Sequence, residues 1–318
     1  MAAFAFEDWV KQEGKRMIVE VNNLQKSFGG KKVLDGLHLS IPEASVYGLV
    51  GKNGAGKTTL LNILAGVSEA TAGECLITGE RICKGGYGSG VVGYLPDLPN
   101  FFDYLTVDEY IRFILSASMA RKDALTRTVE KKVAELELNG KARVKSLSRG
   151  NKQKLGILAA VITEPKVLIL DEPTSALDPV GRREVMSLIR DLRDQGMTIL
   201  FSTHILSDLE LVCDRIGFLH KGIIQKEICM DSGDEQEAYE LVLRSGTEQD
   251  YTEITRTLPA YQVESLDGGN RLVCRPINGL MDQAEFFSAI SKAGADILSV
   301  KKVSRKDLDA IMVEVLSQ

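Results

Sequence analysis

The segment GKNGAGKT, Gly51–Thr58, restricts the fold of this chain more than any other segment. It follows an apolar run, SVYGLV, and precedes a helix-like run, TTLLNILAG. In a strand–loop–helix unit of this pattern, glycines let backbone N–H groups surround phosphate oxygens, and the helix N-terminus adds its positive dipole. Lys57 would reach the β- and γ-phosphates of a nucleotide, and Thr58 would ligate magnesium. A glycine-rich turn with a purely structural role is the alternative.

A regular alternation of strands and helices occupies the middle of the chain. The apolar runs KVLIL, MTILFS and RIGFLH are separated by PVGRREVMSLIRDLRDQG and ILSDLELVCD, which have helical patterns. Continuous apolar strands between amphipathic helices indicate a mainly parallel sheet that is covered on both faces. Upstream, residues 17–82 read as short strands joined by turns. Residues 105–163 read as helical, beginning with a capping box at TVDE, Thr106–Glu109.

The length of 318 residues suggests about two domains. We expect an extension over residues 1–16, a first domain over 17–230 and an accessory α+β domain over 231–318. The polar run DSGDEQE begins the last range as a linker. Beyond it the pattern predicts strand, helix, strand, a DGGN turn, strand, helix, strand and a final helix, an order that suits a ferredoxin-like fold.

Charge and cysteine content argue against several classes of protein. A formal net charge of -5 disfavours a general nucleic-acid binder, because phosphate contacts need basic residues in excess. Apolar runs are much shorter than the roughly 20 residues that cross a bilayer. Acidic residues interrupt the apolar start before a signal-peptide core forms, so we expect a cytosolic chain. Five cysteines without CxxC spacing suggest neither a disulfide framework nor a zinc site.

Two adjacent acids follow one of the apolar strands. In KVLILDEPTSALD, Asp171 and Glu172 come at the carboxyl end of the run, where ligands bind in open α/β sheets. Asp171 can hold magnesium through a water molecule, and Glu172 can polarise a water that attacks the γ-phosphate. The alternative is that the two acids only cap the next helix.

Four segments in one order resemble the ATP-binding cassette (ABC) ATPases. They are GKNGAGKTT, LSRGNKQK, VLILDEPTSALD and FSTH, and the resemblance covers residues 17 to about 230. It implies a P-loop core with a mostly parallel sheet, an N-terminal antiparallel β-subdomain and a helical subdomain at about 98–163. It also implies ATP and Mg²⁺ as ligands. The expected phosphate-binding residues are Gly51, Asn53, Gly54, Ala55, Gly56, Lys57, Thr58 and Thr59.

LSRGNKQK has two interpretations. By itself, Ser148 before the apolar run LGILAAVI is an ordinary helix N-cap. In the resembling family this segment usually reads LSGGQ and caps the γ-phosphate of a nucleotide that is bound to a second copy. The resemblance therefore assigns nucleotide contacts to Ser148, Arg149, Gly150 and Asn151, and it implies a head-to-tail homodimer upon ATP binding.

The resemblance assigns roles to four further residues. Phe28, in KSFGG, matches the aromatic residue that stacks on adenine. His204, in FSTH, matches the histidine that contacts the γ-phosphate and helps to place the attacking water. Asp178, in SALD, matches an acid that bridges the two monomers' sites. Asp97 stands where the family generally has a magnesium-contacting Gln. It is a candidate metal ligand, and a turn acid beside two prolines is the alternative.

The resemblance implies the ATP-binding and ATP-hydrolysing subunit of an ABC transporter. Such a subunit would act on a separate transmembrane permease from the cytoplasmic face of the cell membrane, and we expect no nucleic-acid partner. The segment between Asp97 and Arg121, with the aromatic run NFFDYLTVDEYIRF, is the expected docking surface. The accessory domain favours an exporter like those for multiple drugs or antibiotic peptides. An importer subunit and a soluble cassette protein that acts on ribosomes or DNA are the alternatives.

Overall fold

The computed structural model describes residues 16–82, 90–117, 125–175, 177–230, 238–244, 247–266, 270–277, 283–303 and 308–317. Contacts divide the chain into two compact units, Met1–Met230 together with Glu314–Gln318, and Asp231–Val313. This division differs from the expected domain limits at Glu314–Gln318, which group with the first unit. The domain limits expected from the sequence stay predictions. The extension up to residue 15, the linker DSGDEQE and most of the DGGN turn lie outside the described residues.

A largely parallel sheet forms the centre of the first unit. Its described strands run in the order β10-β9-β3-β8-β7-β6. All neighbours pair in parallel except β10 and β9. The bounds are β3 Val46–Val50, β6 Val92–Leu95, β7 Val167–Asp171, β8 Thr198–Thr203, β9 Arg215–His220 and β10 Ile223–Cys229. Every residue of β3, β7 and β8 is buried, as the continuous apolar runs predicted.

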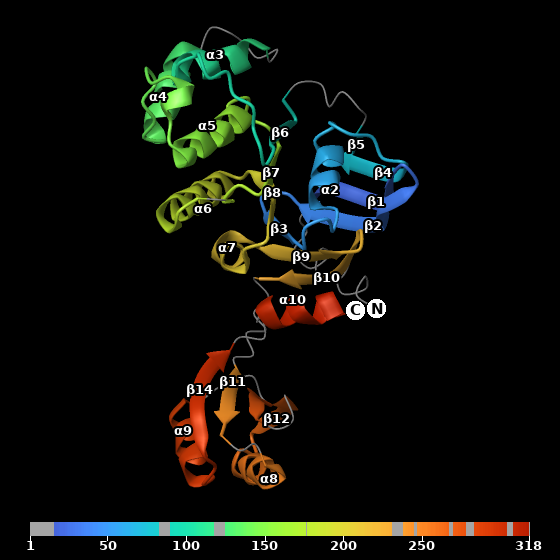
Figure 1. Ribbon diagram of the computed structural model, residues 1–318, viewed down its shortest axis with the longest axis vertical. Coiled ribbons are helices and arrows are strands. Elements are labelled where there is room, and N and C mark those ends of the chain that lie inside the picture. Colours follow the sequence, from blue (N-terminus) through green and yellow to red (C-terminus); the bar gives the residue numbers. More distant parts are fainter. Residues whose placement is uncertain are drawn as a thin grey trace. The chain divides into compact units, whose positions relative to one another are not determined.

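Helices cover both faces of this sheet (Figure 1). Helix α2, Lys57–Leu64, packs with Leu49 of β3 in one buried cluster. On the opposite face, a Cβ added at Gly48 would lie 2.3 Å from Leu209 of α7, Leu206–Val212. Helix α6, Pro179–Asp194, joins β7 to β8. Because the strands are parallel, the segments that follow β3, β7 and β8 all emerge at one edge of the sheet.

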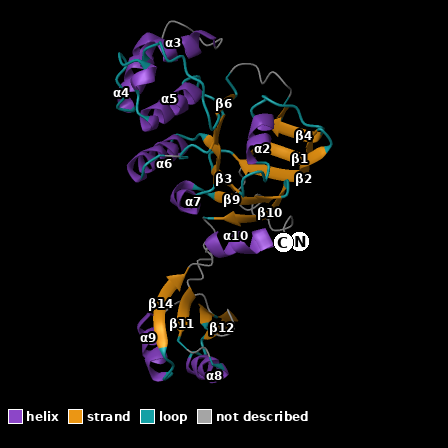
Figure 2. Ribbon diagram, viewed as in Figure 1, coloured by secondary structure: helices purple, strands orange, loops and turns teal. Residues whose placement is uncertain are grey.

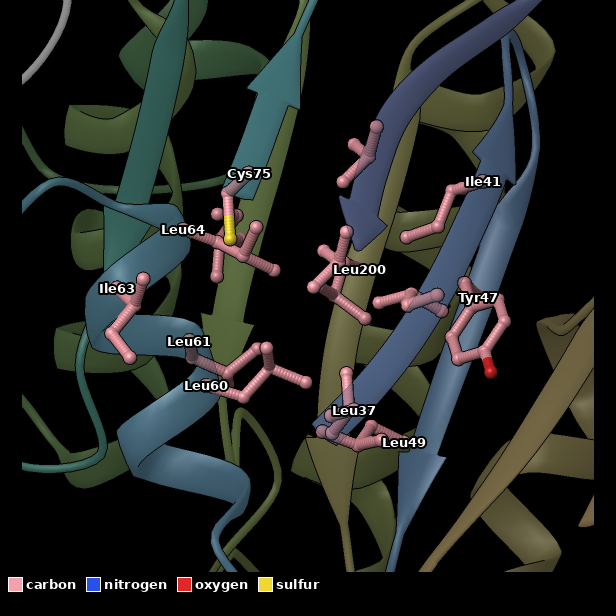
Figure 3. Packing of buried hydrophobic residues seen from close by; sticks show 14 of the residues in the cluster. Leu37, Ile41, Tyr47, Leu49, Leu60, Leu61, Ile63, Leu64, Cys75 and Leu200 are labelled. Carbon is pink, nitrogen blue, oxygen red and sulfur yellow. The ribbon is translucent and has the colours of Figure 1, made fainter. Parts of the chain in front are cut away.

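A second, antiparallel sheet lies beside α2 in the order β2-β1-β4-β5. The bounds are β1 Met17–Phe28, β2 Lys31–Pro42, β4 Ala72–Ile77 and β5 Glu80–Arg81. The expectation of short strands is wrong for β1 and β2, which have 12 residues each. The register between β1 and β2 shifts at several points, one of them between Val21 and Leu24. These shifts interrupt the alternation of apolar and polar residues, but the two strands stay paired. Figure 3 shows side chains of α2 beside those of β2 and Leu200 of β8.

The helical segment has its own buried core. It contains α3 Val107–Ala117, α4 Leu125–Glu135, a short 3-10 turn at Val144–Ser146 and α5 Arg149–Val161. The capping box before α3 is confirmed. Thr106 N donates to Glu109 Oε2 at 2.8 Å, and Glu109 N donates to Thr106 Oγ1 at 3.2 Å. Hydrogen bonds from the Thr106 backbone N–H and from the Thr106 side chain to the exposed Glu109 carboxyl lower its pKa.

The second unit has the order of strands and helices along the chain that the sequence pattern predicted. Its described strands form an antiparallel sheet, β12-β13-β11-β14, and its helices α8 and α9 contribute to the buried cluster beside the sheet (Figure 2). The bounds are β11 Ala238–Leu243, α8 Glu248–Thr257, β12 Tyr261–Leu266, β13 Arg271–Pro276, α9 Gln283–Lys292 and β14 Ile297–Val303. A last helix, α10, spans Leu308–Ser317. Within the described ranges, every helix is too short or too polar to span a bilayer.

Candidate active site

A cleft of about 610 Å³ opens where the segments after β3 and β7 meet. It contains six of the predicted phosphate-binding residues and two of the predicted acids. Lysines that the sequence analysis did not single out also line it. The lining residues are Lys31, Lys32, Val33, Lys52, Asn53, Gly54, Gly56, Lys57, Thr58, Thr59, Asp97, Glu172, Lys221 and Gly222.

Glycines are required where the loop between β3 and α2 turns. Gly54 and Gly56 have φ angles of 82° and 114°, a region that side chains disfavour. A Cβ at Gly56 would also lie 2.8 Å from Leu34 Cδ2. Gly51 and Ala55 belong to the same loop, but they are buried and do not line the cleft. Helix α2 begins after Gly56 without a side-chain cap, so the first turn can offer its N–H groups to an anion in the cleft.

The ammonium group of Lys57 is held over this loop. The side chain is only 7% exposed, and its Nζ donates to the Gly51 carbonyl oxygen at 2.8 Å. The same Nζ lies 3.4 Å from Glu172 Oε1. One buried cation therefore joins the glycine-rich loop to the acid that follows β7.

Asp171 ends β7 with a fully buried carboxylate. Its Oδ1 accepts from Ser202 Oγ of β8 at 2.6 Å. Burial raises the pKa of the Asp171 carboxyl; hydrogen bonds from the Ser202 and Thr58 hydroxyls oppose this rise, and the charges of Asp97 and Glu172 add to it. The buried Oδ2 has no hydrogen bond of normal geometry. An incompletely paired carboxylate oxygen near a hydroxyl is a donor set that suits a hard divalent cation.

Asp97 brings a second carboxylate to the cleft. Its Oδ1 accepts from Ser175 Oγ at 3.0 Å. The described residues contain no cluster of three or more His, Cys, Asp or Glu side chains that could hold a metal ion. Magnesium commonly binds through one or two carboxylates together with water and phosphate oxygens. Thr58, Asp171 and Asp97 fit that mode of binding, in which the nucleotide itself completes the coordination.

Glu172 and His204 form a pair at the edge of the cleft. Glu172 has a φ of 49°, an uncommon backbone conformation for this residue type. Its backbone N donates to Ser202 Oγ at 3.0 Å, and its Oε2 lies 2.8 Å from His204 Nδ1. The His204 side chain is 56% exposed. The structure therefore brings together the two residues to which the sequence assigns catalysis.

The remaining predicted residues do not line this cleft. Phe28 is 53% exposed at the end of β1, with Lys26 Nζ 4.7 Å from its ring centroid. Ser148 caps α5 by accepting from Asn151 N at 3.2 Å, so its interpretation as an N-cap is confirmed. Asp178 caps α6 by accepting from Gly181 N at 2.9 Å. Arg149 and Gly150 open the exposed first turn of α5, where a Cβ at Gly150 would have no neighbour within 4 Å.

Comparisons with known proteins point to one family. A family model described as ABC transporter matches residues 34–175. The lantibiotic transport ATP-binding protein SrtF of Streptococcus pyogenes is 34% identical over 212 residues, which cover 66% of this chain and 91% of SrtF. The bacitracin transport ATP-binding protein BcrA of Bacillus licheniformis is 35% identical over 219 residues, 67% of this chain and 70% of BcrA.

A solved structure supports the same relationship. The ATP-binding subunit of an ABC transporter superimposes with a TM-score of 0.61 and is 28% identical, over 67% of this chain and 90% of that one. The shared fold combines the antiparallel and parallel sheets described above. The expected fold class of the first unit is therefore confirmed.

Proposed function

The chain belongs to the family of ABC transporter ATP-binding proteins and is an ATPase, and on that premise we propose that it drives export through a separate membrane permease. The observation that carries the proposal is a chain of contacts beside the glycine-rich loop: Lys57 and Glu172 line one cleft, and His204 contacts Glu172 at the edge of that cleft. Each of these groups has a distinct task in phosphoryl transfer.

Phosphate binding falls to the loop and the first turn of α2. Backbone N–H groups and the helix dipole attract the phosphate oxygens, and the Lys57 ammonium neutralises their charge. Thr58, Asp171 and Asp97 would hold Mg²⁺, which when bound supplies charge neutralisation at the β- and γ-phosphates. The phosphate would also compete with Glu172 for Lys57, whose Nζ lies 3.4 Å from the carboxylate. That competition would leave the Glu172 carboxylate available to a water molecule.

Glu172 and His204 would direct the attacking water. Glu172 would accept a proton or hydrogen bond from the water, and His204 would contact both this carboxylate and the γ-phosphate. Their 2.8 Å contact keeps the two side chains at one point of the cleft edge. Positioning and electrostatic stabilisation would then supply the catalytic effect.

A second copy of the chain would complete each site. Ser148, Arg149, Gly150 and Asn151 do not line their own chain's cleft, and the first turn of α5 begins at an exposed Ser148. Asp178 is exposed as well. Two chains arranged head to tail would bring this turn to the γ-phosphate of the partner's nucleotide, so that ATP binding favours a homodimer. Phe28 would stack on adenine in the same closed state.

The permease would dock on an aromatic surface of the helical segment, at the cytoplasmic face of the membrane. Phe102, Tyr104 and Phe113 are exposed there. Phe102 packs against Phe113 with ring centroids 5.1 Å apart and against Tyr104 at 6.0 Å. Contiguous exposed apolar groups of this kind mark interaction sites. The names of SrtF and BcrA support transport, and export of an antibiotic-like compound, over an importer or a role on ribosomes or DNA.

The proposal predicts that a neighbouring gene encodes a multi-span membrane protein, and it is tested by producing the full chain together with that protein. We expect the two to co-purify from detergent-solubilised membranes and the complex to hydrolyse ATP. Phe113→Asp should disrupt the complex. Leu211→Asp is the matched control, because both residues are helical and 46% and 47% exposed. Failure to co-purify, or equal effects of the two variants, would contradict the proposed docking surface.

A further inference from the structure

Two side-chain contacts join the same pair of segments near the proposed catalytic site. One segment follows β7 and carries Glu172 and Thr174, while the other follows β8 and carries His204 and Asp208. The first contact is the one between Glu172 Oε2 and His204 Nδ1 at 2.8 Å. In the second, Thr174 Oγ1 donates to Asp208 Oδ2 at 2.6 Å.

The Thr174–Asp208 contact is more deeply buried than the Glu172–His204 contact. Thr174 and Asp208 are 1% and 2% exposed. Arg182 of α6 donates from NH2 to the other carboxylate oxygen of Asp208 at 2.6 Å. Both oxygens of Asp208 are therefore engaged, by groups from two different elements. Hydrogen bonds to a buried carboxylate are strong, because an unpaired charge in the protein interior is costly.

We infer that Thr174 and Asp208 are positioning residues that keep Glu172 and His204 in contact. Glu172 lies two residues before Thr174, and Asp208 lies four residues after His204. Fixing Thr174 to Asp208 therefore limits how far the two segments can separate. The His204 side chain is 56% exposed, so its position depends largely on the backbone that carries it. This inference rests on the proposed roles of Glu172 and His204.

The inference predicts an effect on turnover and not on nucleotide affinity. Thr174 and Asp208 do not line the cleft that contains Lys57 and Thr58. Loss of the Thr174 hydroxyl should therefore leave ATP binding unchanged. Small misplacement of a catalytic group costs up to about 100-fold in rate, so we expect kcat to fall by about tenfold.

The experiment compares three variants of the full chain. Thr174→Val removes the hydroxyl at nearly constant volume, and Thr174→Ser restores it without the methyl group. Thr198→Val is the matched control: Thr198 is also 1% exposed, and its hydroxyl accepts from Ala44 N at 2.9 Å. Thr198 begins β8, so it lies at the end of the strand away from His204. Steady-state ATP hydrolysis and equilibrium binding of a fluorescent ATP analogue are measured for each variant, with thermal melts to check folding.

The inference requires that T174V lower kcat without weakening binding, that T174S stay near the wild-type kcat, and that T198V leave kcat unchanged. Equal losses in T174V and T198V, an unchanged kcat in T174V, or a loss confined to ATP affinity would each overturn it. If T174V does not fold, T174A takes its place in the same comparison. A wild-type chain that neither binds nor hydrolyses ATP would instead contradict the proposed function.

Discussion

Two helix N-termini in the first unit are candidates to face phosphate, and they are built differently. Helix α2 begins after Gly56 with no side-chain cap, at the cleft that Lys57 and Thr58 line. Helix α5 begins after Ser148, whose hydroxyl already accepts from Asn151 N at 3.2 Å. The first turn of α2 therefore has backbone N–H groups that can bind a ligand in the cleft of its own chain. The first turn of α5 is exposed and partly satisfied from within, and in the proposed function it would serve a group that approaches from outside.

Because the two helix starts differ, nucleotide binding and closure of the site would be separate events, each with its own helix. In the proposed function, nucleotide binding depends on α2 and its loop, whereas closure of the site would depend on α5 of another copy. The proposed catalytic pair, Glu172 and His204, belongs to neither helix and follows β7 and β8. Variants in the three places should therefore fail in three distinguishable ways.

The largest effect is expected at the catalytic pair. Glu172→Gln removes the proton acceptor while the Lys57 contact to the loop remains, so kcat should fall by about 10²–10⁴-fold. ATP binding should persist, and a dimer should accumulate because hydrolysis no longer reopens it. Turnover assays and light scattering with ATP measure the two results. Wild-type turnover in this variant would remove Glu172 from the catalytic role.

The next effect tests the α2 side of the comparison. Lys57→Ala deletes the buried cation that reaches over the loop, and loss of one partner of a desolvated charge pair costs about 2–5 kcal/mol. ATP affinity should fall correspondingly, as measured by titration of a fluorescent ATP analogue. Lys131→Ala is a suitable control, since Lys131 is an exposed cation of α4 outside the cleft lining. Equal affinities in the two variants would argue against phosphate binding by the loop.

The third effect tests α5. Ser148→Arg places a bulky cation at the exposed helix start, and we expect monomers to bind ATP normally while the dimer and its turnover are lost. Thr247→Ala serves as the control for loss of an N-cap, which is worth about 1 kcal/mol of stability, because Thr247 caps α8 by accepting from Asp250 N at 3.2 Å and has no proposed nucleotide contact. Sedimentation with ATP and the Glu172→Gln background reports dimer formation. Full activity of S148R by itself would exclude a site shared between two copies.

The same comparison shows which parts of the site could be predicted from the sequence. Residues of the loop at α2 are covalent neighbours, so one motif identifies Gly54, Gly56, Lys57 and Thr58 together. Glu172 and His204 are distant in sequence, but both follow apolar strands, and parallel strands bring their carboxyl ends to one edge. The motif and the order of strands were therefore sufficient to predict that these residues lie close together in the site.

Residues that reach the site from a different sheet could not be identified in this way. Lys31 and Lys32 line the cleft because the hairpin of β1 and β2 packs against the β9–β10 turn. Asp35 N donates to the Gly222 carbonyl oxygen at 3.2 Å, and a Cβ at Gly222 would lie 2.4 Å from the Val33 carbonyl oxygen. Such close backbone packing depends on tertiary structure. No local pattern in KSFGGKK indicates it.

The buried Thr174–Asp208 contact was missed for a related reason. An Asp in a short helix ordinarily faces solvent. Here Asp208 is buried because Arg182 and Thr174 supply hydrogen-bond donors from α6 and from the segment after β7. The sequence contains all three residues, but only the fold brings them together.

The smallest effect concerns Asp97, where the chain departs from the Gln of its family. Asp97→Gln removes a negative charge from the cleft, so the Mg²⁺ concentration for half-maximal nucleotide binding should rise, by about tenfold or less if Asp97 touches the cation directly or through water. Ser175→Ala is the matched variant, since it removes the hydroxyl that donates to Asp97 Oδ1 and keeps the charge.

The pH dependence of Asp97→Gln gives a second, independent readout. The Asp97 charge helps to raise the pKa of the Asp171 carboxyl. A raised pKa means that Asp171 takes up its proton at a higher pH as the solution is acidified, and a protonated carboxyl binds Mg²⁺ poorly. D97Q should therefore lower this pKa and move the acid limb of Mg²⁺-dependent binding to lower pH, whereas S175A should leave the limb nearly in place. If D97Q changes neither the acid limb of the pH profile nor the Mg²⁺ requirement, Asp97 is not part of the metal site. Its role is then only the hydrogen bond that it accepts from Ser175.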